Sequence, residues 1–270
     1  MTCRALAVLI LTLVHSACAN RSQPPQTIAA TPAVPQSASP PPATQPAVPA
    51  PPKIVRPFEG ITVHLDPAGS FVEVAAEACL DEGYLEQVAC SPGTREHESL
   101  LVVAAKPSQI HAALLLAGFE PGLPGRWTYE NQTLGTIDPT GDAIDVRVRY
   151  TKPDGEEVQT PIREWIRGVV PPHGESDREP VYEKFPELPW VFGGSSIARN
   201  TPGMPPGEHY VADMTGSIIG LVTFGDETIG FSRVLADQED VQAPEWEVNT
   251  PAVPPMGTKV TLVLRRWSGN

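Results

Sequence analysis

The chain has 270 residues, of which 32 are acidic and 19 are basic, so its formal net charge at pH 7 is −13. All the acidic residues follow residue 58, where only 15 basic residues lie, and this part of the chain carries a formal charge of −17. No basic patch or arginine-rich run is present, which argues against nucleic acid as a partner and against direct docking on anionic lipids.

An export signal is predicted at residues 1–19. Arg4 supplies a positive charge, and residues 5–14 form a run of ten residues that are all apolar except Thr12. A run of this length is typical of a signal-peptide core and is too short to span a bilayer.

Two processing routes remain open at the end of the signal. Ala17 and Ala19 form an A-x-A site, and cleavage there would release a soluble protein. Alternatively, Ser16-Ala17-Cys18 resembles the end of a bacterial lipobox, in which Cys18 is lipidated. We favour lipidation of Cys18, although His15 stands where a lipobox normally has an aliphatic residue.

A proline-rich tether is predicted at residues 20–58. It contains eleven prolines between Pro24 and Pro52 and no acidic residue. Such a composition buries too little apolar surface to offset the entropy of ordering the chain, and its prolines keep it extended. We therefore expect an extracytoplasmic protein, in the periplasm or on the cell surface, whose membrane contact is at most a lipid on Cys18.

Residues 59–270 are predicted to form one α+β domain with a mostly antiparallel sheet. Residues 61–66 and 71–79 alternate around the turn PAGS and predict a hairpin, and residues 84–90 and 99–105 predict further strands. The run KPSQIHAALLLAG changes period and predicts a helix at about residues 107–117, which begins at a proline and ends before a glycine.

The second half of this domain is also predicted to be mainly β. Residues 143–150 (AIDVRVRY) alternate cleanly, and 158–162 return after the turn TKPDGEE. A second short helix is possible at 163–170, an exposed excursion is expected at 171–189, and late strands are predicted at 209–213, 217–224 and 258–267. Many strands with one clear helix and no regular βαβ alternation indicate the α+β class.

Two cysteines, Cys79 and Cys90, belong to the domain. In an exported chain two such residues usually pair, so we expect a Cys79–Cys90 disulfide, worth roughly 3 kcal/mol in the chain-entropy model. The alternative is a pair of free buried thiols on core strands. Zinc and iron–sulfur centres need four ligands at suitable spacing, which the sequence lacks, and no cofactor is predicted.

Several motifs together resemble the YdjY-domain proteins. They are EACLDEGYLEQVACSPGTREHESLLVV at residues 77–103, followed by IHAALLLAGFEPGLPG, EWIR, WVFGGSS, YVADMTGSIIGLVTF and PPMGTKVTLVLR. The resemblance covers nearly all of residues 61–266. It implies an exported, often lipid-anchored bacterial protein, and it implies no particular activity. The ferredoxin-like label that some members carry is not transferred, because the cysteines that a cluster needs are absent.

The stretch TREHES raises the question of chemistry at His97 and Glu98. It does not match the metalloprotease motif HExxH, because Leu101 occupies the position of the second histidine. We expect the pair to fix the turn before a strand. The functional alternative is a cation site formed by His97, Glu98, Glu86, His111 and Asp213.

Nucleophile motifs are absent, since FGGSS at residues 192–196 lacks the Gly-x-Ser-x-Gly pattern. The sequence therefore favours a non-catalytic binding or interaction module of the cell envelope. Its partner would be an envelope protein or a small ligand. The alternative is a metal-dependent or hydrolytic enzyme that uses His97, Glu98 and nearby carboxylates.

Overall fold

The computed structural model describes residues 51–170, 181–236 and 245–269. All the described residues belong to one compact unit, Val48–Asn270. The predicted signal peptide, Cys18 and most of the predicted tether lie outside the described residues. No helix within the described ranges is long and apolar enough to cross a membrane.

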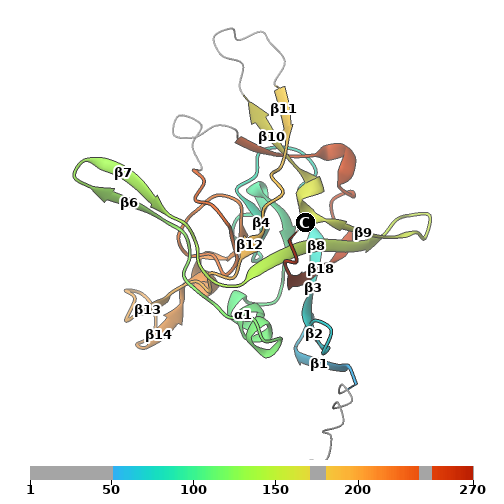
Figure 1. The fold of residues 1–270 in the computed structure, drawn as a ribbon, viewed down its shortest axis with the longest axis horizontal. Coiled ribbons are helices and arrows are strands. Elements are labelled where there is room, and N and C mark those ends of the chain that lie inside the picture. The colour runs from blue at the N-terminus through green and yellow to red at the C-terminus, as the bar shows by residue number, and fades with distance from the viewer. Residues whose placement is uncertain (1–50, 171–180, 237–244, 270) are drawn as a thin grey trace, which may run out of the picture. The chain divides into compact units, whose positions relative to one another are not determined.

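The unit is mostly β, and its main sheet is barrel-like (Figure 1). The strands are mainly antiparallel, with β4 and β5 forming a parallel pair. A bridge between Ile219 and Ile229 links the two ends of the strand order. That order is β15 (Ser217–Gly220), β4 (Gln87–Cys90), β5 (Ser99–Val102), β3 (Phe71–Ala78), β18 (Lys259–Arg266), β8 (Ala143–Thr151), β12 (Trp190–Val191) and β16 (Gly230–Phe231).

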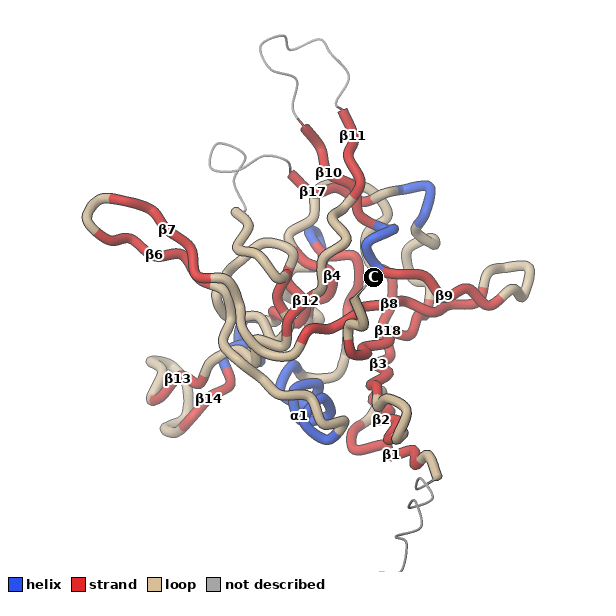
Figure 2. Tube along the Cα trace, viewed as in Figure 1, coloured by secondary structure: helices blue, strands red, loops and turns tan. Residues whose placement is uncertain are grey.

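Other strands extend the main sheet or form smaller sheets (Figure 2). The main sheet gains β1 (Lys53–Phe58), β2 (Ile61–Leu65) and β9 (Glu157–Pro161). The smaller sheets are β11 (Val181–Lys184) with β10 (Ile166–Val170) and β17 (Glu245–Val248), β13 (Ile197–Arg199) with β14 (Glu208–Tyr210), and β6 (Arg126–Glu130) with β7 (Thr133–Ile137).

Alternation along β3, β8 and β18 builds the core. Leu262 of β18 is paired with Val74 of β3 on one side and with Val148 of β8 on the other. All three side chains are buried. Burial of such a side chain contributes roughly 1.5–3 kcal/mol. The hairpin predicted at 61–79 and the strand predicted at 143–150 are confirmed as β2–β3 and β8.

The first strand lies in the range that the sequence assigned to the tether. β1 covers Lys53–Phe58 and pairs antiparallel with β2, with a register shift between Val55 and Phe58. Pro57 lies at that irregularity, which suits a residue that cannot donate a ladder hydrogen bond. Regular structure therefore begins six residues before the predicted domain boundary.

The predicted helix at 107–117 is confirmed as α1 (Pro107–Leu116). Pro107 occupies the first turn, and the side chain of Gln109 accepts a hydrogen bond from the Lys106 N–H at 2.9 Å. Gly118 follows the helix with φ = 86°, a conformation that glycine adopts without the cost of a β-carbon. Helix α1 contacts β2 and β3.

Two local predictions were wrong. Residues 163–170 form the end of the 3₁₀ turn η2 (Ile162–Trp165) and strand β10 rather than a helix, because β10 pairs with strands on both sides. Residues 211–213 lie in the short helix α2 (Val211–Thr215) rather than in a strand. The remaining 3₁₀ turns are η1 (Glu96–Glu98) and η3 (Thr250–Ala252).

The predicted Cys79–Cys90 disulfide is absent, because both cysteines are free thiols. Cys79 follows β3, and its N–H donates a hydrogen bond to the carbonyl of Leu100 in β5. Cys90 in β4 pairs with Val102, on the other side of β5. β5 therefore lies between the two cysteines. Two strand spacings separate their α-carbons by roughly 9.5 Å, and a disulfide spans only about 4.4–6.8 Å.

We predict that the native chain keeps Cys79 and Cys90 reduced and unreactive. Burial raises the pKa of Cys79 to about 12 and also raises the pKa of Cys90. Alkylation of Cys79 by iodoacetamide at pH 8 should therefore be about a thousandfold slower than alkylation of an ordinary thiol, because the thiolate is the reactive form. Mass spectrometry after denaturation should show both cysteines alkylated, and a peptide pair linked through them would contradict the strand arrangement.

Candidate functional site

His97 lies on the surface of a turn that leads into β5. Its side chain is 76% exposed, and its Nε2 lies 3.4 Å from Glu98. The turn is the 3₁₀ segment η1, in which the Glu96 carboxylate accepts a hydrogen bond from the Gly93 N–H. Ser99, the first residue of β5, donates its hydroxyl to the Arg95 carbonyl at 2.7 Å. These contacts of Glu96 and Ser99 fix the turn, a role that the sequence analysis assigned to His97 and Glu98.

Arg95 is the centre of this polar cluster. Its guanidinium lies 3.5 Å from Glu86 and 3.4 Å from Glu98, and it stacks 3.8 Å from the centroid of the Phe224 ring. A guanidinium that contacts two carboxylates offsets part of their negative charge. Glu86 and Glu98 are therefore partners of Arg95 in this structure.

His111 lies in a different part of the molecule, on α1, and its side chain faces β14. Its Nδ1 lies 3.0 Å from the Tyr210 hydroxyl, and that hydroxyl lies 3.2 Å from the Thr228 hydroxyl. The ring also packs edge-on against Phe192 at 4.8 Å. Burial lowers the pKa of His111, which favours the neutral imidazole.

Asp213 lies in α2, and its side chain makes a second contact with α1. Its carboxylate accepts hydrogen bonds from the N–H of Ser108 at 2.8 Å and from the Ser108 hydroxyl at 2.6 Å. Ser108 lies in the first turn of α1, where backbone N–H groups lack partners within the helix. The Asp213 carboxylate thus stabilises the beginning of α1 and ties α2 to it.

The alternative cation site is not assembled among the described residues. Glu86 and Glu98 contact Arg95, and His97 lies beside Glu98. His111 instead contacts Tyr210 of β14, and Asp213 contacts Ser108 of α1. Within the described ranges, no group of three or more His, Cys, Asp and Glu side chains could hold a metal ion. The sequence could not reveal this separation, because it depends on contacts between residues about 100 positions apart.

Gly194 of the FGGSS motif leaves space for the His111 ring. Gly194 has φ = 80°, and a β-carbon there would lie 2.9 Å from Pro121 and 3.2 Å from the His111 ring. Ser195 follows with φ = 54°, and its hydroxyl donates to the Asp226 carbonyl and accepts from the Ala212 N–H at 3.1 Å. The Ser195 hydroxyl therefore joins the loop at Asp226 to the beginning of α2.

Sequence reasoning missed Glu227, which is the most perturbed carboxyl group of the described domain. The side chain is 2% exposed and accepts hydrogen bonds from the backbone N–H groups of Phe224 and Gly225. Burial raises the pKa of Glu227 to about 7. The fragment FGDET looks like an ordinary turn, so no local signal distinguishes Glu227 from an exposed glutamate.

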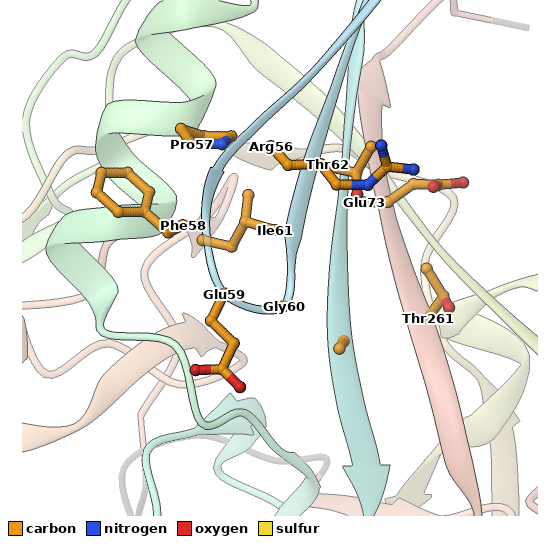
Figure 3. A pocket seen from close by; sticks show the side chains of 10 residues that line it. Arg56, Pro57, Phe58, Glu59, Gly60, Ile61, Thr62, Glu73 and Thr261 are labelled. Atoms are coloured by element: carbon orange, nitrogen blue, oxygen red, sulfur yellow. The ribbon is translucent and has the colours of Figure 1, made fainter.

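One cavity lies beside the first hairpin (Figure 3). Its volume is about 580 Å³, and it lies between the β1–β2 turn on one side and Glu73 and Thr261 on the other. Glu73 is already bound to neighbours, since its carboxylate lies 3.0 Å from His64 and 2.8 Å from Arg149.

A larger cavity of about 830 Å³ lies where β10 and β11 meet η2 and η3. Ile166 and Phe185 supply buried apolar surface, and the Arg167 guanidinium stacks 3.7 Å from the centroid of the Tyr182 ring. The lining as a whole contains three basic and three acidic side chains. These are Arg163, Arg167, Lys184, Glu164, Glu183 and Glu187.

The fold and these sites define an acidic, mostly β domain with a barrel-like sheet and a polar surface cavity. The chain matches the YdjY domain over residues 66–265 and belongs to that family, as its motifs predicted. The larger cavity lies within the matched region, whereas most residues of the first cavity precede it. Comparisons with curated proteins and with solved structures found no match.

We predict that Glu227 makes the stability of the domain fall as pH rises. Its folded pKa of about 7 lies above the ordinary value of 4.5, so the folded state binds the proton more tightly than the unfolded state. Stability should therefore decrease between about pH 4.5 and pH 7, by on the order of 3 kcal/mol from this group. Glu227→Gln should remove that part of the pH dependence.

Urea unfolding followed by tryptophan fluorescence at pH 5 and pH 8 measures this difference. The exposed strand residue Glu157 provides a matched control, because Glu157→Gln should shift both values equally. An unchanged pH dependence in Glu227→Gln would show that the carboxyl group titrates normally.

Proposed function

We propose that the protein is an exported envelope lipoprotein, anchored through Cys18, whose YdjY domain binds a ligand without transforming it. The main support for this proposal is the cavity of about 830 Å³, whose volume falls within the range of ligand pockets. Its described lining carries charged groups of both signs that can bind a ligand, and it includes no serine, cysteine or histidine.

The polar residues outside the cavity support the same proposal. His97 is exposed beside Glu98, and Arg95 bridges the nearby carboxylates. Asp213 joins α2 to α1, and His111 joins α1 to β14. These side chains have partners that account for their positions in the fold.

The cavity is suited to a polar ligand that carries both charges, such as a short peptide. Three basic and three acidic side chains can pair with opposite ends of such a ligand, and charge-assisted hydrogen bonds are stronger than neutral ones. The stacked Arg167–Tyr182 pair adds a planar surface. A strongly anionic ligand fits less well, because Glu164, Glu183 and Glu187 would repel it.

The anchor is tested by expressing the full chain with a clickable fatty acid and separating membranes from soluble protein. The full chain should carry the label and sediment with membranes, and Cys18→Ser should lose both properties. Cys3→Ser is the matched control, because Cys3 lies in the part of the signal that is removed. A soluble, unlabelled chain that begins after Ala19 would establish the other processing route.

Ligand binding is tested by native mass spectrometry of the full chain, extracted from envelopes with mild detergent and without chelators. A non-covalent organic adduct is expected. Lys184→Glu should weaken its retention by about tenfold or more, because a hydrogen bond to a charged group contributes roughly 1.5–3 kcal/mol. Lys152→Glu, on the distant β8–β9 turn, should leave the adduct unchanged.

The same spectra separate the binding module from the enzyme alternative. A stoichiometric metal that is lost in His97→Ala would contradict the proposal and favour metal-dependent chemistry. An adduct that survives in Lys184→Glu would place the ligand elsewhere on the molecule.

A further inference from the structure

The β6–β7 hairpin extends away from the barrel (Figures 1 and 2). In the described part of the chain, β6 and β7 form a two-stranded sheet of their own. Asn131 and Gln132 form a two-residue turn in which both residues have positive φ, 50° and 64°. This is the type I′ geometry that matches the natural twist of a hairpin.

One face of this hairpin is apolar and largely exposed. Trp127 and Tyr129 of β6 share a face with Leu134 of β7, since Tyr129 pairs directly with Leu134. Tyr129 is 73% exposed and Leu134 is 53% exposed. A two-stranded hairpin is marginally stable in water, and a third strand is usually needed to support it.

The outer edge of β6 is able to accept such a strand. Glu130 and Thr133 close the two-residue turn, so Arg126, Thr128 and Glu130 direct their backbone groups to β7. The backbone groups of Trp127 and Tyr129 then point outward. β6 contains no proline, no lysine and no bulge, so three of the usual protections of an edge strand are missing, and its charged residues are Arg126 and Glu130.

We propose that a second copy of this chain pairs its β6 with this edge, antiparallel, around a two-fold axis at Thr128. In that register Arg126 faces Glu130 of the second copy, and Glu130 faces Arg126 of the second copy. Trp127 likewise faces Tyr129 of the second copy. The sequence RWTYE is thus complementary to itself in charge and in aromatic character.

The backbone pattern agrees with this register. Trp127 and Tyr129 direct their N–H and C=O groups outward, so each forms a hydrogen-bonded pair with the other residue of the second copy. The dimer becomes a four-stranded sheet, and its isologous interface closes on itself. Opposite charges and aromatic side chains across strands each contribute roughly 0.2–1 kcal/mol. The β7 edge has no charged residue to fix a register.

The first test is a cross-link at the axis. Thr128 faces itself across the interface in a pair whose β-carbons lie about 4.5–5.5 Å apart, close to disulfide geometry. Purified full-length chain carrying Thr128→Cys, oxidised with copper phenanthroline in mild detergent, should give a disulfide-linked dimer on a non-reducing gel. Cys79 and Cys90 are within the folded domain, and the unsubstituted chain reports the background from every thiol other than residue 128.

Thr133→Cys is the matched control, because Thr133 is exposed on the same hairpin but lies on β7, away from the axis. It should cross-link no more than the unsubstituted chain. Equal dimer formation from Thr128→Cys and Thr133→Cys would overturn the β6 register and indicate contact through β7 or random collision. A failure of Thr128→Cys to exceed the background would overturn the proposal altogether.

The second test exchanges the charges in the Thr128→Cys chain. Arg126→Glu or Glu130→Arg alone places like charges opposite each other, and either should reduce the cross-linked fraction about tenfold. A mixture of these two variants restores opposite charges across the axis and should cross-link as a mixed dimer. A merely structural effect on the hairpin would not be rescued by mixing, so the absence of mixed dimers would contradict the proposed pairing.

Discussion

The position of β18 between β3 and β8 is the constraint on which the rest of the domain depends. This strand is the last one in the chain, and it pairs along most of its length with a strand from the beginning of the domain and with one from its middle. Leu262 and Leu264 cannot be buried until all three strands are present. The sheet is therefore stabilised by long-range pairing, in which the closure of long loops precedes the gain from burial.

Around this sheet, polar residues hold irregular segments in place. Asp213 and Tyr210 join α2 and its preceding strand to α1, and Ser195 joins the loop at 226 to the beginning of α2. Glu227 satisfies the N–H groups of a turn at the cost of a buried carboxyl group. These contacts meet the hydrogen-bonding requirement of backbone that belongs to no strand or helix.

The sequence was sufficient where local pattern decides structure. The alternation of Ile144, Val146 and Val148 and the Pro107–Gly118 frame of α1 correctly indicated a strand and a helix. The sequence was insufficient where contacts between distant residues decide the structure. β10 looked helical because its pairing with β11 and β17 is invisible in a short window. The Cys79–Cys90 bridge was a reasonable expectation for an exported chain, but the insertion of β5 between the two strands removes it.

The same distinction applies to the candidate site. His97, Glu86, His111 and Asp213 have the chemistry of metal ligands, yet chemistry without proximity makes no site, and the fold gives each of them another partner. Two surface features of the described residues are of a different kind: a charged cavity beside β11 and the outer edge of β6. Both are suited to recognition, because edges and mixed-charge clefts bind other molecules without requiring a reactive group. The proposed binding role therefore depends on these two surfaces rather than on the residue types that could have made a metal site.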